Sequence, residues 1–345
     1  MRKIIVTGGA GYVGSHTVVE LQQAGFEVII VDNLSNSSVE VISGIETITG
    51  IRPHFENVDC LNYNELSNVM TKYHEISAII HFAASKAVGE SVEKPLLYYR
   101  NNLVSLINIL QLMPTHGIKN IVFSSSCTVY GQPDELPVSE NAPIKPALSP
   151  YGNTKQICEE IIRDTLHTNR KLKSIILRYF NPIGAHPSAL IGELPIGVPN
   201  NLVPFITQTA SGLRKQLSVY GSDYNTPDGS CIRDYINVVD LAKAHVIAMK
   251  RLLEAKSLDQ VEYFNLGTGH GLSVLDIINT FKNVNKINVP YQIVERRNGD
   301  IEKVWANSEK ANNVLGWTAV ESIENTLRSA WDWEKHLAKK ESCLI

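Results

Sequence analysis

A tyrosine and a lysine lie four residues apart at Tyr151 and Lys155, where a helix is predicted to begin. This spacing puts both side chains on one face of the helix, one turn apart. A free tyrosine has a pKa of about 10 and is a poor base at neutral pH. A nearby ammonium group would stabilise the phenolate and lower that pKa. The pair therefore predicts a tyrosine that accepts a proton, although the same spacing also occurs in ordinary amphipathic helices.

Three consecutive serines, Ser124, Ser125 and Ser126, follow a predicted strand upstream of this helix. Parallel α/β sheets bind their ligands at the carboxyl edge of the strands, so these hydroxyls are predicted to face a ligand. Chance would rarely produce these serines together with the tyrosine–lysine pair and the glycine-rich loop described next, although each of them alone is common. We therefore expect a hydride-transfer site.

Gly8, Gly11 and Gly14 form a GxxGxxG pattern that also contains Tyr12 and Val13, between the first predicted strand and the first predicted helix. Glycine is needed where the chain turns tightly and approaches a pyrophosphate closely. The helix N-terminus offers N–H groups and a partial positive charge to the phosphates. A tight turn alone would explain an isolated glycine pattern, but its place between a strand and a helix favours a dinucleotide-binding loop.

An acidic residue, Asp32, closes the second predicted strand 18 residues after Gly14. A carboxylate at this place accepts hydrogen bonds from the adenosine ribose hydroxyls of a dinucleotide. The next residues, Asn33 and Leu34, offer no arginine for a 2′-phosphate. The sequence therefore favours NAD over NADP, and the alternative is that Asp32 is a surface turn residue.

Apolar, β-branched runs alternate with amphipathic stretches through the first half of the chain, which is typical of βαβ units with a parallel sheet. The predicted strands, each buried on both faces or nearly so, are 3–6, 27–31, 78–81, 120–124 and 174–178, and the predicted helices are 13–23, 64–73, 95–115 and 151–168. We therefore predict a doubly wound α/β fold with a parallel (Rossmann) sheet.

The pattern changes after about residue 180, where the segment 181–200 is rich in proline and glycine. Helices are predicted at 201–212, 239–255, 273–282 and 322–336, with a strand at 262–265. We predict an NAD-binding domain at residues 1–180 and a smaller substrate-binding α/β domain at residues 181–345. The chain is expected to cross between the two more than once.

Composition excludes several classes of protein. The chain has 345 residues, 43% of them hydrophobic, and a formal net charge of −3. This near-balance of charge argues against a dedicated nucleic-acid or anionic-membrane binder. Five scattered cysteines without CxxC or Cys/His spacing indicate reduced thiols and no metal site. No stretch has the pattern of a signal peptide or a transmembrane helix, so a cytoplasmic protein is expected.

The chain resembles the extended branch of the short-chain dehydrogenase/reductase superfamily and, within it, the UDP-glucose 4-epimerase family. The segments that carry the resemblance are TGGAGYVGSH at 7–16, DNLSNS at 32–37, HFAASKAVGES at 81–91, SSSCTVYG at 124–131, SPYGNTK at 149–155, RYFNPIGAHPS at 178–188, PNNLVP at 199–204, RDYINVVDLA at 233–242 and RRNGD at 296–300. The first and fifth of these segments are shared across the superfamily, whereas KAVGES, RYFNPIGAHPS and RRNGD are more particular.

The resemblance implies NAD-dependent epimerisation at C4 of UDP-hexoses through a transient 4-keto sugar, in a protein expected to be a homodimer. It assigns Tyr151 as the general base, Lys155 as the residue that tunes it and holds the nicotinamide ribose, and Ser126 as a ligand of the sugar's 4-oxygen. The implied cofactor contacts are Gly8, Gly11, Tyr12, Val13, Gly14, Asp32, Asn33, Asp59, Cys60, Phe82, Ala83, Ala84, Lys86, Asn101, Ser124, Tyr151, Lys155 and Tyr179. The implied substrate contacts are Lys86, Ser126, Tyr151, Asn181, Asn201, Leu202, Arg233, Arg297, Asp300 and Val304.

The size of the side chain at Val304 is expected to determine which sugars the substrate site accepts. In the resembling epimerases the position four residues after the aspartate of the RRxGD segment gates the space around the C2 substituent, and a small side chain there leaves room for an acetamido group. The sequence therefore predicts activity on both plain and N-acetylated UDP-hexoses. The alternative is that Val304 is simply a buried strand residue.

Among other activities of the same superfamily, the sequence disfavours 4,6-dehydration and a non-catalytic role. A nucleotide-sugar 4,6-dehydratase needs an acid and a base after the active-site serine, where this chain has Cys127 and Thr128. A non-catalytic NAD sensor would be expected to lack the Tyr151–Lys155 pair. An epimerase of UDP-glucuronate or of a UDP-pentose differs only in what contacts C5 and is harder to exclude.

Overall fold

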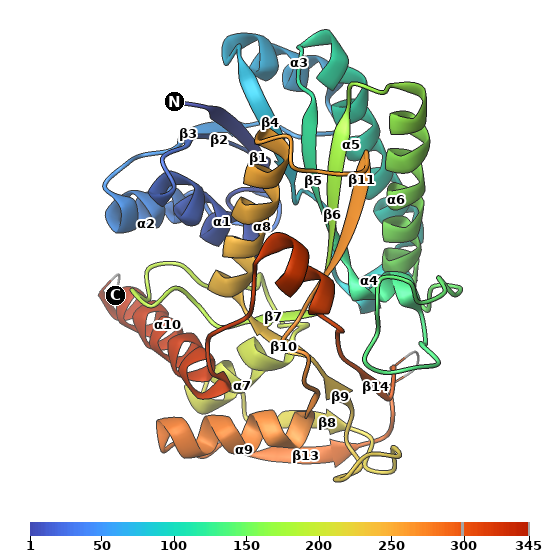
Figure 1. The fold of residues 1–345 in the computed structure, drawn as a ribbon. Coiled ribbons are helices and arrows are strands. Elements are labelled where there is room, and N and C mark those ends of the chain that lie inside the picture. The colour runs from blue at the N-terminus through green and yellow to red at the C-terminus, as the bar shows by residue number, and fades with distance from the viewer. Residues whose placement is uncertain (298–299, 344–345) are drawn as a thin grey trace.

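A parallel sheet forms the centre of the computed structural model, which describes residues 1–297 and 300–343 (Figure 1). Within these residues, seven strands are hydrogen-bonded in the order β3-β2-β1-β4-β5-β6-β11. They are β1 (Lys3–Thr7), β2 (Glu27–Asp32), β3 (His54–Asn57), β4 (Ile76–His81), β5 (Asn120–Ser126), β6 (Lys173–Tyr179) and β11 (Val261–Leu266). The order reverses between β1 and β4, where ligands bind in doubly wound sheets.

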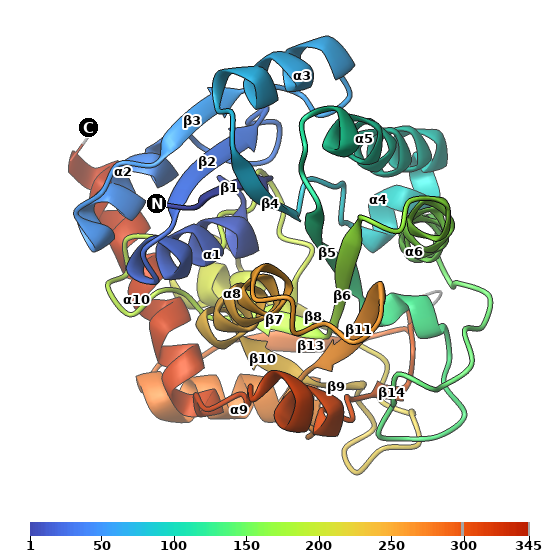
Figure 2. The same cartoon turned by 45° about the horizontal axis from the view of Figure 1, so that its top comes forward.

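Helices cover both faces of this sheet, as Figure 2 shows with α1 and α8 on one side and α5 and α6 on the other. Neighbouring residues of β1 belong to different hydrophobic clusters. Ile4 and Val6 pack with α1 and α8 on one face of the sheet. Ile5 packs with α3, α5 and α6 on the other face. A strand covered on both faces must be apolar at successive positions, which explains why these strands show no alternation. The predicted doubly wound α/β fold is confirmed.

The helices of this half of the molecule agree closely with the sequence pattern. They are α1 (Tyr12–Gln23), α2 (Glu40–Thr49), α3 (Tyr63–Lys72), α4 (Val88–Glu93), α5 (Pro95–Thr115) and α6 (Pro150–Thr168), with a short 3₁₀ helix η1 (Cys127–Tyr130) after β5. None of α2, α4 and β3 is predicted from the sequence. β3 is an edge strand with exposed ends and lacks the apolar run that marks its neighbours.

Three small sheets and three helices form the region below the large sheet in Figure 1. Their strands are β7 (Asn181–Ile183), β8 (Leu217–Tyr220), β9 (Ile232–Arg233), β10 (Tyr235–Asn237), β12 (Leu272–Ser273), β13 (Tyr291–Val294) and β14 (Lys303–Val304). The helices are α7 (Leu202–Ala210), α9 (Val274–Asn285) and α10 (Ile323–Cys343), and they pack around Ile206, Ile277, Phe281 and Leu327.

Two later segments return to the large sheet. Helix α8 (Val238–Leu253) packs on it beside α1, and β11 pairs with β6 in parallel; a π-helical turn η2 (Ala311–Leu315) contacts both of these elements. The division at residue 180 remains a prediction. No helix in the described part of the chain is long and apolar enough to cross a membrane.

Candidate active site

The glycine-rich loop leaves no space for side chains. Gly8 has a φ of +70°, and a Cβ atom there would lie 2.7 Å from the backbone nitrogen of Ala83. A Cβ on Gly14 would overlap the carbonyl oxygen of Gly8. Helix α1 begins directly after Gly11, without a side-chain cap or an acidic residue in its first turn. Its first N–H groups are therefore free to bind an anion such as a pyrophosphate.

The carboxylate of Asp32 is held beside this loop at the end of β2. It accepts hydrogen bonds from the backbone nitrogens of Ala10, at 3.0 Å, and Leu34, at 2.9 Å, and from the hydroxyl of Ser37, at 2.9 Å. These donors fix the orientation of a side chain that is only 9% exposed. Asp32, which is predicted to bind the adenosine ribose, therefore lies at the carboxyl edge of the sheet.

Further predicted cofactor residues surround this edge. Asn33 donates to Asp59 at 3.0 Å, while neighbouring Cys60 is buried and its thiol pKa is raised to about 12 by that burial. After β4, the backbone nitrogens of Phe82 and Ala83 both donate to the carbonyl of Thr7, which places Ala84 and the residues that follow beside the glycine loop.

Asn101 reaches the same region from α5. Its side-chain amide donates to the hydroxyl of Ser85 at 3.0 Å, and the neighbouring Asn102 accepts a hydrogen bond from the backbone of Ser85. Two successive residues of one helix thus hold the chain segment that follows β4.

Tyr151, Lys155 and Ser126 come together at the start of α6. The Lys155 Nζ donates to the carbonyl of Ser124 at 2.7 Å and lies 6.0 Å from the centre of the Tyr151 ring. Burial lowers the pKa of Lys155 to about 8, opposed by Cys158 and Glu159. Burial raises the pKa of Tyr151, while a hydrogen bond with Ser126 lowers it. The geometry suits a tyrosine whose phenolate depends on an adjacent cation and a hydroxyl.

Tyr179 adds a second phenol to this cluster. It ends β6 directly opposite Ser126, and its hydroxyl lies 2.7 Å from that of Ser124. The two outer serines of the triplet therefore face the site, together with both tyrosines.

The predicted substrate residues Arg233, Arg297 and Asp300 form a second cluster. Arg297 donates to the Asp300 carboxylate at 2.7 Å, and an Nη atom of Arg233 lies 4.0 Å from the same oxygen. One carboxylate thus orients two guanidinium groups, a pair suited to a diphosphate. Asn298 and Gly299, which complete the RRNGD segment, lie outside the described residues.

Val304 and Asn181 lie on short strands near this cluster. Val304 pairs in register with Arg233, and its side chain is 3% exposed within an apolar cluster that includes Val129 and Phe180. Asn181 begins β7 and its backbone nitrogen donates to the carbonyl of Asp234. Leu202 begins α7 and packs against the apolar cluster beneath it.

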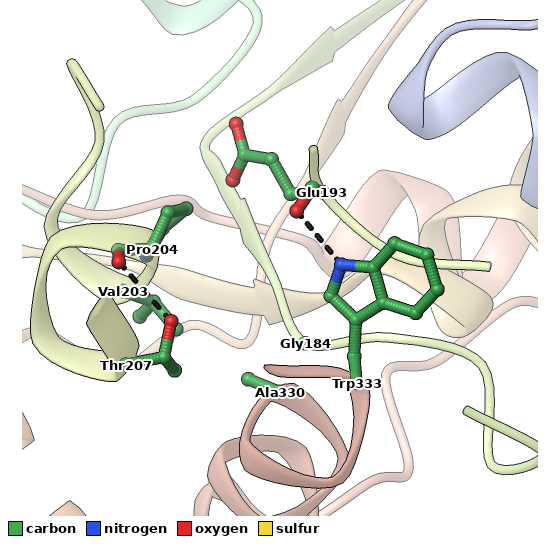
Figure 3. Close-up of a pocket in the computed structure, with 7 residues that line it drawn as sticks. All are labelled: Gly184, Glu193, Val203, Pro204, Thr207, Ala330 and Trp333. Atoms are coloured by element: carbon green, nitrogen blue, oxygen red, sulfur yellow. Dashed lines mark hydrogen bonds between the residues drawn. The ribbon is translucent and has the colours of Figure 1, made fainter. Parts of the chain in front are cut away.

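Glu193 is not singled out by the sequence, yet its carboxylate joins two predicted site residues. One oxygen accepts from Lys86 Nζ at 3.2 Å and from Asn201 Nδ2 at 2.6 Å. Its backbone is anchored in turn, because the Trp333 indole donates to the Glu193 carbonyl at 2.9 Å (Figure 3). No periodic pattern in the sequence indicates this residue, since Lys86 is 107 residues away and Asn201, eight residues away, follows a segment rich in proline and glycine.

Comparisons with known proteins place this geometry in a family. Residues 5–330 match a family model described as GDP-mannose 4,6 dehydratase. The UDP-glucose 4-epimerase of Dictyostelium discoideum is 49% identical, over 96% of this chain and 95% of that protein. The corresponding mouse (Mus musculus) protein is 46% identical, over 97% of each chain. The chain belongs to the UDP-glucose 4-epimerase family.

Solved structures of this family share the fold throughout. A UDP-glucose 4-epimerase from Stenotrophomonas maltophila, with bound NAD and formylated UDP-arabinopyranose, matches with a TM-score of 0.95 and 44% identity, covering 99% of this chain and 100% of that one. The Bifidobacterium longum enzyme, in complex with NAD⁺ and UDP, matches with a TM-score of 0.92 and 43% identity, covering 97% and 98%.

Proposed function

We propose that this chain interconverts the C4 epimers UDP-glucose and UDP-galactose, with NAD as a bound cofactor. The decisive observation is the meeting of Tyr151, Ser126 and Lys155 at the same sheet edge as the glycine loop, in a member of the UDP-glucose 4-epimerase family. The reaction causes no net oxidation, so the cofactor would remain bound between turnovers. Galactose metabolism is the corresponding physiological role that we propose.

The residues around the glycine loop fit NAD. Gly8 and Gly14 line a close backbone approach that a Cβ would fill, and the first turn of α1 offers free N–H groups. Asp32 would hold the adenosine ribose and Lys155 the nicotinamide ribose. NAD bound there supplies a hydride acceptor that can return the hydride to either face of C4.

The chain's own residues supply the proton chemistry. Tyr151 would accept the proton of the 4-hydroxyl, and the ammonium of Lys155 would offset the burial that disfavours the phenolate. Ser126 would hold the 4-oxygen. Arg233 and Arg297 would anchor the diphosphate. The 4-keto sugar can then rotate to present its other face while the UDP moiety stays bound.

We also propose that the enzyme accepts N-acetylated UDP-hexoses. The small side chain of Val304 shares an apolar cluster with Val129, three residues after Ser126, and with Phe180, which directly follows Tyr179. It is thus close to the predicted sugar site. A related structure, 35% identical, is described as the UDP-Glc/GlcNAc 4-epimerase of Campylobacter jejuni.

A panel of substrates tests these proposals together. Purified protein is incubated with UDP-galactose, UDP-N-acetylgalactosamine, UDP-glucuronate, a UDP-pentose and GDP-mannose, and the products are separated by chromatography. We expect C4 epimers of the first two. A 4-keto-6-deoxy product from GDP-mannose would instead support dehydration, although Cys127 and Thr128 offer no suitable acid–base pair.

We further propose a cytoplasmic homodimer. The described cysteines Cys60, Cys127, Cys158 and Cys231 are free thiols, as expected in a reducing compartment. Helix α5 exposes Leu97, Val104 and Ile107, whose spacing places them along one side of the helix. Such a stripe is a candidate for burial against a second copy. Sedimentation of the protein at micromolar concentration should give twice the chain mass, and a single-chain mass would contradict the dimer.

A further inference from the structure

A buried ion pair lies one helical turn beyond Lys155. Glu159 on α6 and Arg178 on β6 form a bidentate pair, with Nε–Oε1 and Nη2–Oε2 distances of 3.0 Å and 2.5 Å. The two side chains are 7% and 6% exposed. None of the predicted cofactor or substrate residues is a member of this pair.

The pair is connected to the serine triplet through its middle member. Ser125 lies directly opposite Arg178 in the β5–β6 register, and its hydroxyl donates to Glu159 Oε1 at 2.6 Å. Because side chains alternate along a strand, Ser125 points towards α6, whereas Ser124 and Ser126 point the other way. The middle serine therefore contacts α6, while the two outer serines face the candidate site.

Arg178 is itself held from several sides. It donates to the Tyr130 hydroxyl at 2.9 Å, and that hydroxyl donates to Asn265 on β11 at 2.7 Å. The guanidinium also lies 4.7 Å from the ring centre of Tyr263. The carboxylate of Glu159 is therefore fixed by β5, β6, η1 and β11 together.

Stability alone is a weak reason for such a pair. Removing two charges from water costs free energy, and replacement of a buried ion pair by well-packed apolar side chains is often neutral or stabilising. The carboxylate of Glu159 lies near a predicted site residue, because Glu159 follows Lys155 by four residues on the same face of α6.

We propose that Glu159, oriented by Arg178, is a positioning residue that fixes the ammonium of Lys155 and the Ser124–Ser126 strand end relative to each other. Lys155 holds the strand through the carbonyl of Ser124, and Glu159 holds it one residue later through the hydroxyl of Ser125. The inference rests on the proposed epimerase function, in which Lys155 supports the phenolate of Tyr151 and Ser126 holds the 4-oxygen of the sugar.

Glu159 forms its ion pair with Arg178, and its carboxylate also acts at longer range on Lys155. Among the described titratable groups that face Lys155, His81 on β4 has its pKa lowered to about 3 and Cys158 on α6 has its pKa raised to about 12, so both are neutral near pH 7. Tyr151 is neutral until it loses its proton. The carboxylate of Glu159 favours the charged ammonium and opposes the burial that lowers its pKa.

Glu159→Gln tests the proposal because it keeps the shape and removes the charge. The pKa of Lys155 should fall further, so the alkaline limb of the kcat profile should move to lower pH by about one unit or more, with little change in KM for UDP-galactose. Ser125→Ala is the matched control: it leaves both charges in place and should reduce kcat less, without moving the limb.

A second variant covers the case in which Glu159→Gln does not fold, since it leaves Arg178 unpaired. Glu159→Gln combined with Arg178→Met removes both buried charges and should move the alkaline limb in the same direction but by less, because loss of the Arg178 cation opposes loss of the carboxylate. A folded single or double variant whose limb matches that of the unmodified enzyme would overturn the proposal and leave the pair a structural feature only.

The charge of Lys155 can also be followed without activity. In protein labelled with ¹⁵N-lysine, the Nζ signal that disappears in Lys155→Met should titrate at lower pH in Glu159→Gln than in the unmodified chain. An unchanged midpoint would contradict the inference. Failure of the unmodified protein to epimerise any UDP-sugar would instead contradict the proposed function, while this titration would still decide the role of Glu159.

Discussion

Tyr151 shows how one phenol can depend on its neighbours. Burial raises its pKa and a hydrogen bond with Ser126 lowers it, while the Lys155 ammonium lies 6.0 Å from its ring centre, so the proposed proton transfer relies on both neighbours. Tyr151→Phe removes the proton acceptor and keeps the ring packing. We expect kcat to fall by about 10²–10⁴-fold, the usual range for losing a general base, with unchanged NAD content and melting temperature. Near-normal turnover in a steady-state assay would exclude Tyr151 as the base.

Val304 gives a second prediction at the scale of the residue. Val304→Tyr places a ring where the sugar's C2 substituent is expected, and should abolish epimerisation of UDP-N-acetylgalactosamine while UDP-galactose still reacts. Overpacking this cluster costs about 1–3 kcal/mol, so the melting temperature is measured alongside. Val304→Ala is the control that should retain both activities. If the unmodified enzyme does not convert N-acetyl sugars, Val304 is only a buried strand residue.

At the scale of the element, the junction of β1 and α1 depends on glycine. Gly14→Ala would push a Cβ into the carbonyl of Gly8 and distort the loop that faces the pyrophosphate. We expect loss of most bound NAD and a stability decrease of about 1–3 kcal/mol, measured by cofactor release and thermal unfolding. Gly89→Ala, at a position where a Cβ meets no atom within 4 Å, should leave both unchanged. Full NAD content in Gly14→Ala would contradict the assigned loop.

At the scale of the whole molecule, the proposed reaction regenerates its cofactor within each cycle. Purified protein should therefore contain close to one NAD per chain and should turn over without added nucleotide. Acid denaturation followed by an enzymatic NAD assay of the supernatant measures this. Protein that releases only NADP would contradict the interpretation of Asp32, whose carboxylate is already oriented beside the loop by backbone donors.

Much of the fold and part of the site follow from local patterns. The glycine loop, Asp32 and the Tyr151–Lys155 pair depend on contacts within one βαβ unit or one helical turn, so spacing is enough to predict them. Buried parallel strands are equally visible, because burial on both faces requires an apolar run. The sequence alone missed α2, whose segment contains glycine and several β-branched residues and whose Ile42 and Ile45 are buried against the α1 side of the core.

Other features were decided by the tertiary structure alone. Glu193 meets Lys86, Glu159 meets Ser125 and Arg178, and Arg233 approaches Asp300, in each case between separate elements of the chain. The return of α8 and β11 to the large sheet belongs to the same class. Contacts between distant residues leave no period or spacing in the sequence. They arise only when the sheet order brings separate strand ends to one edge, and that order is set by the packing of the whole molecule.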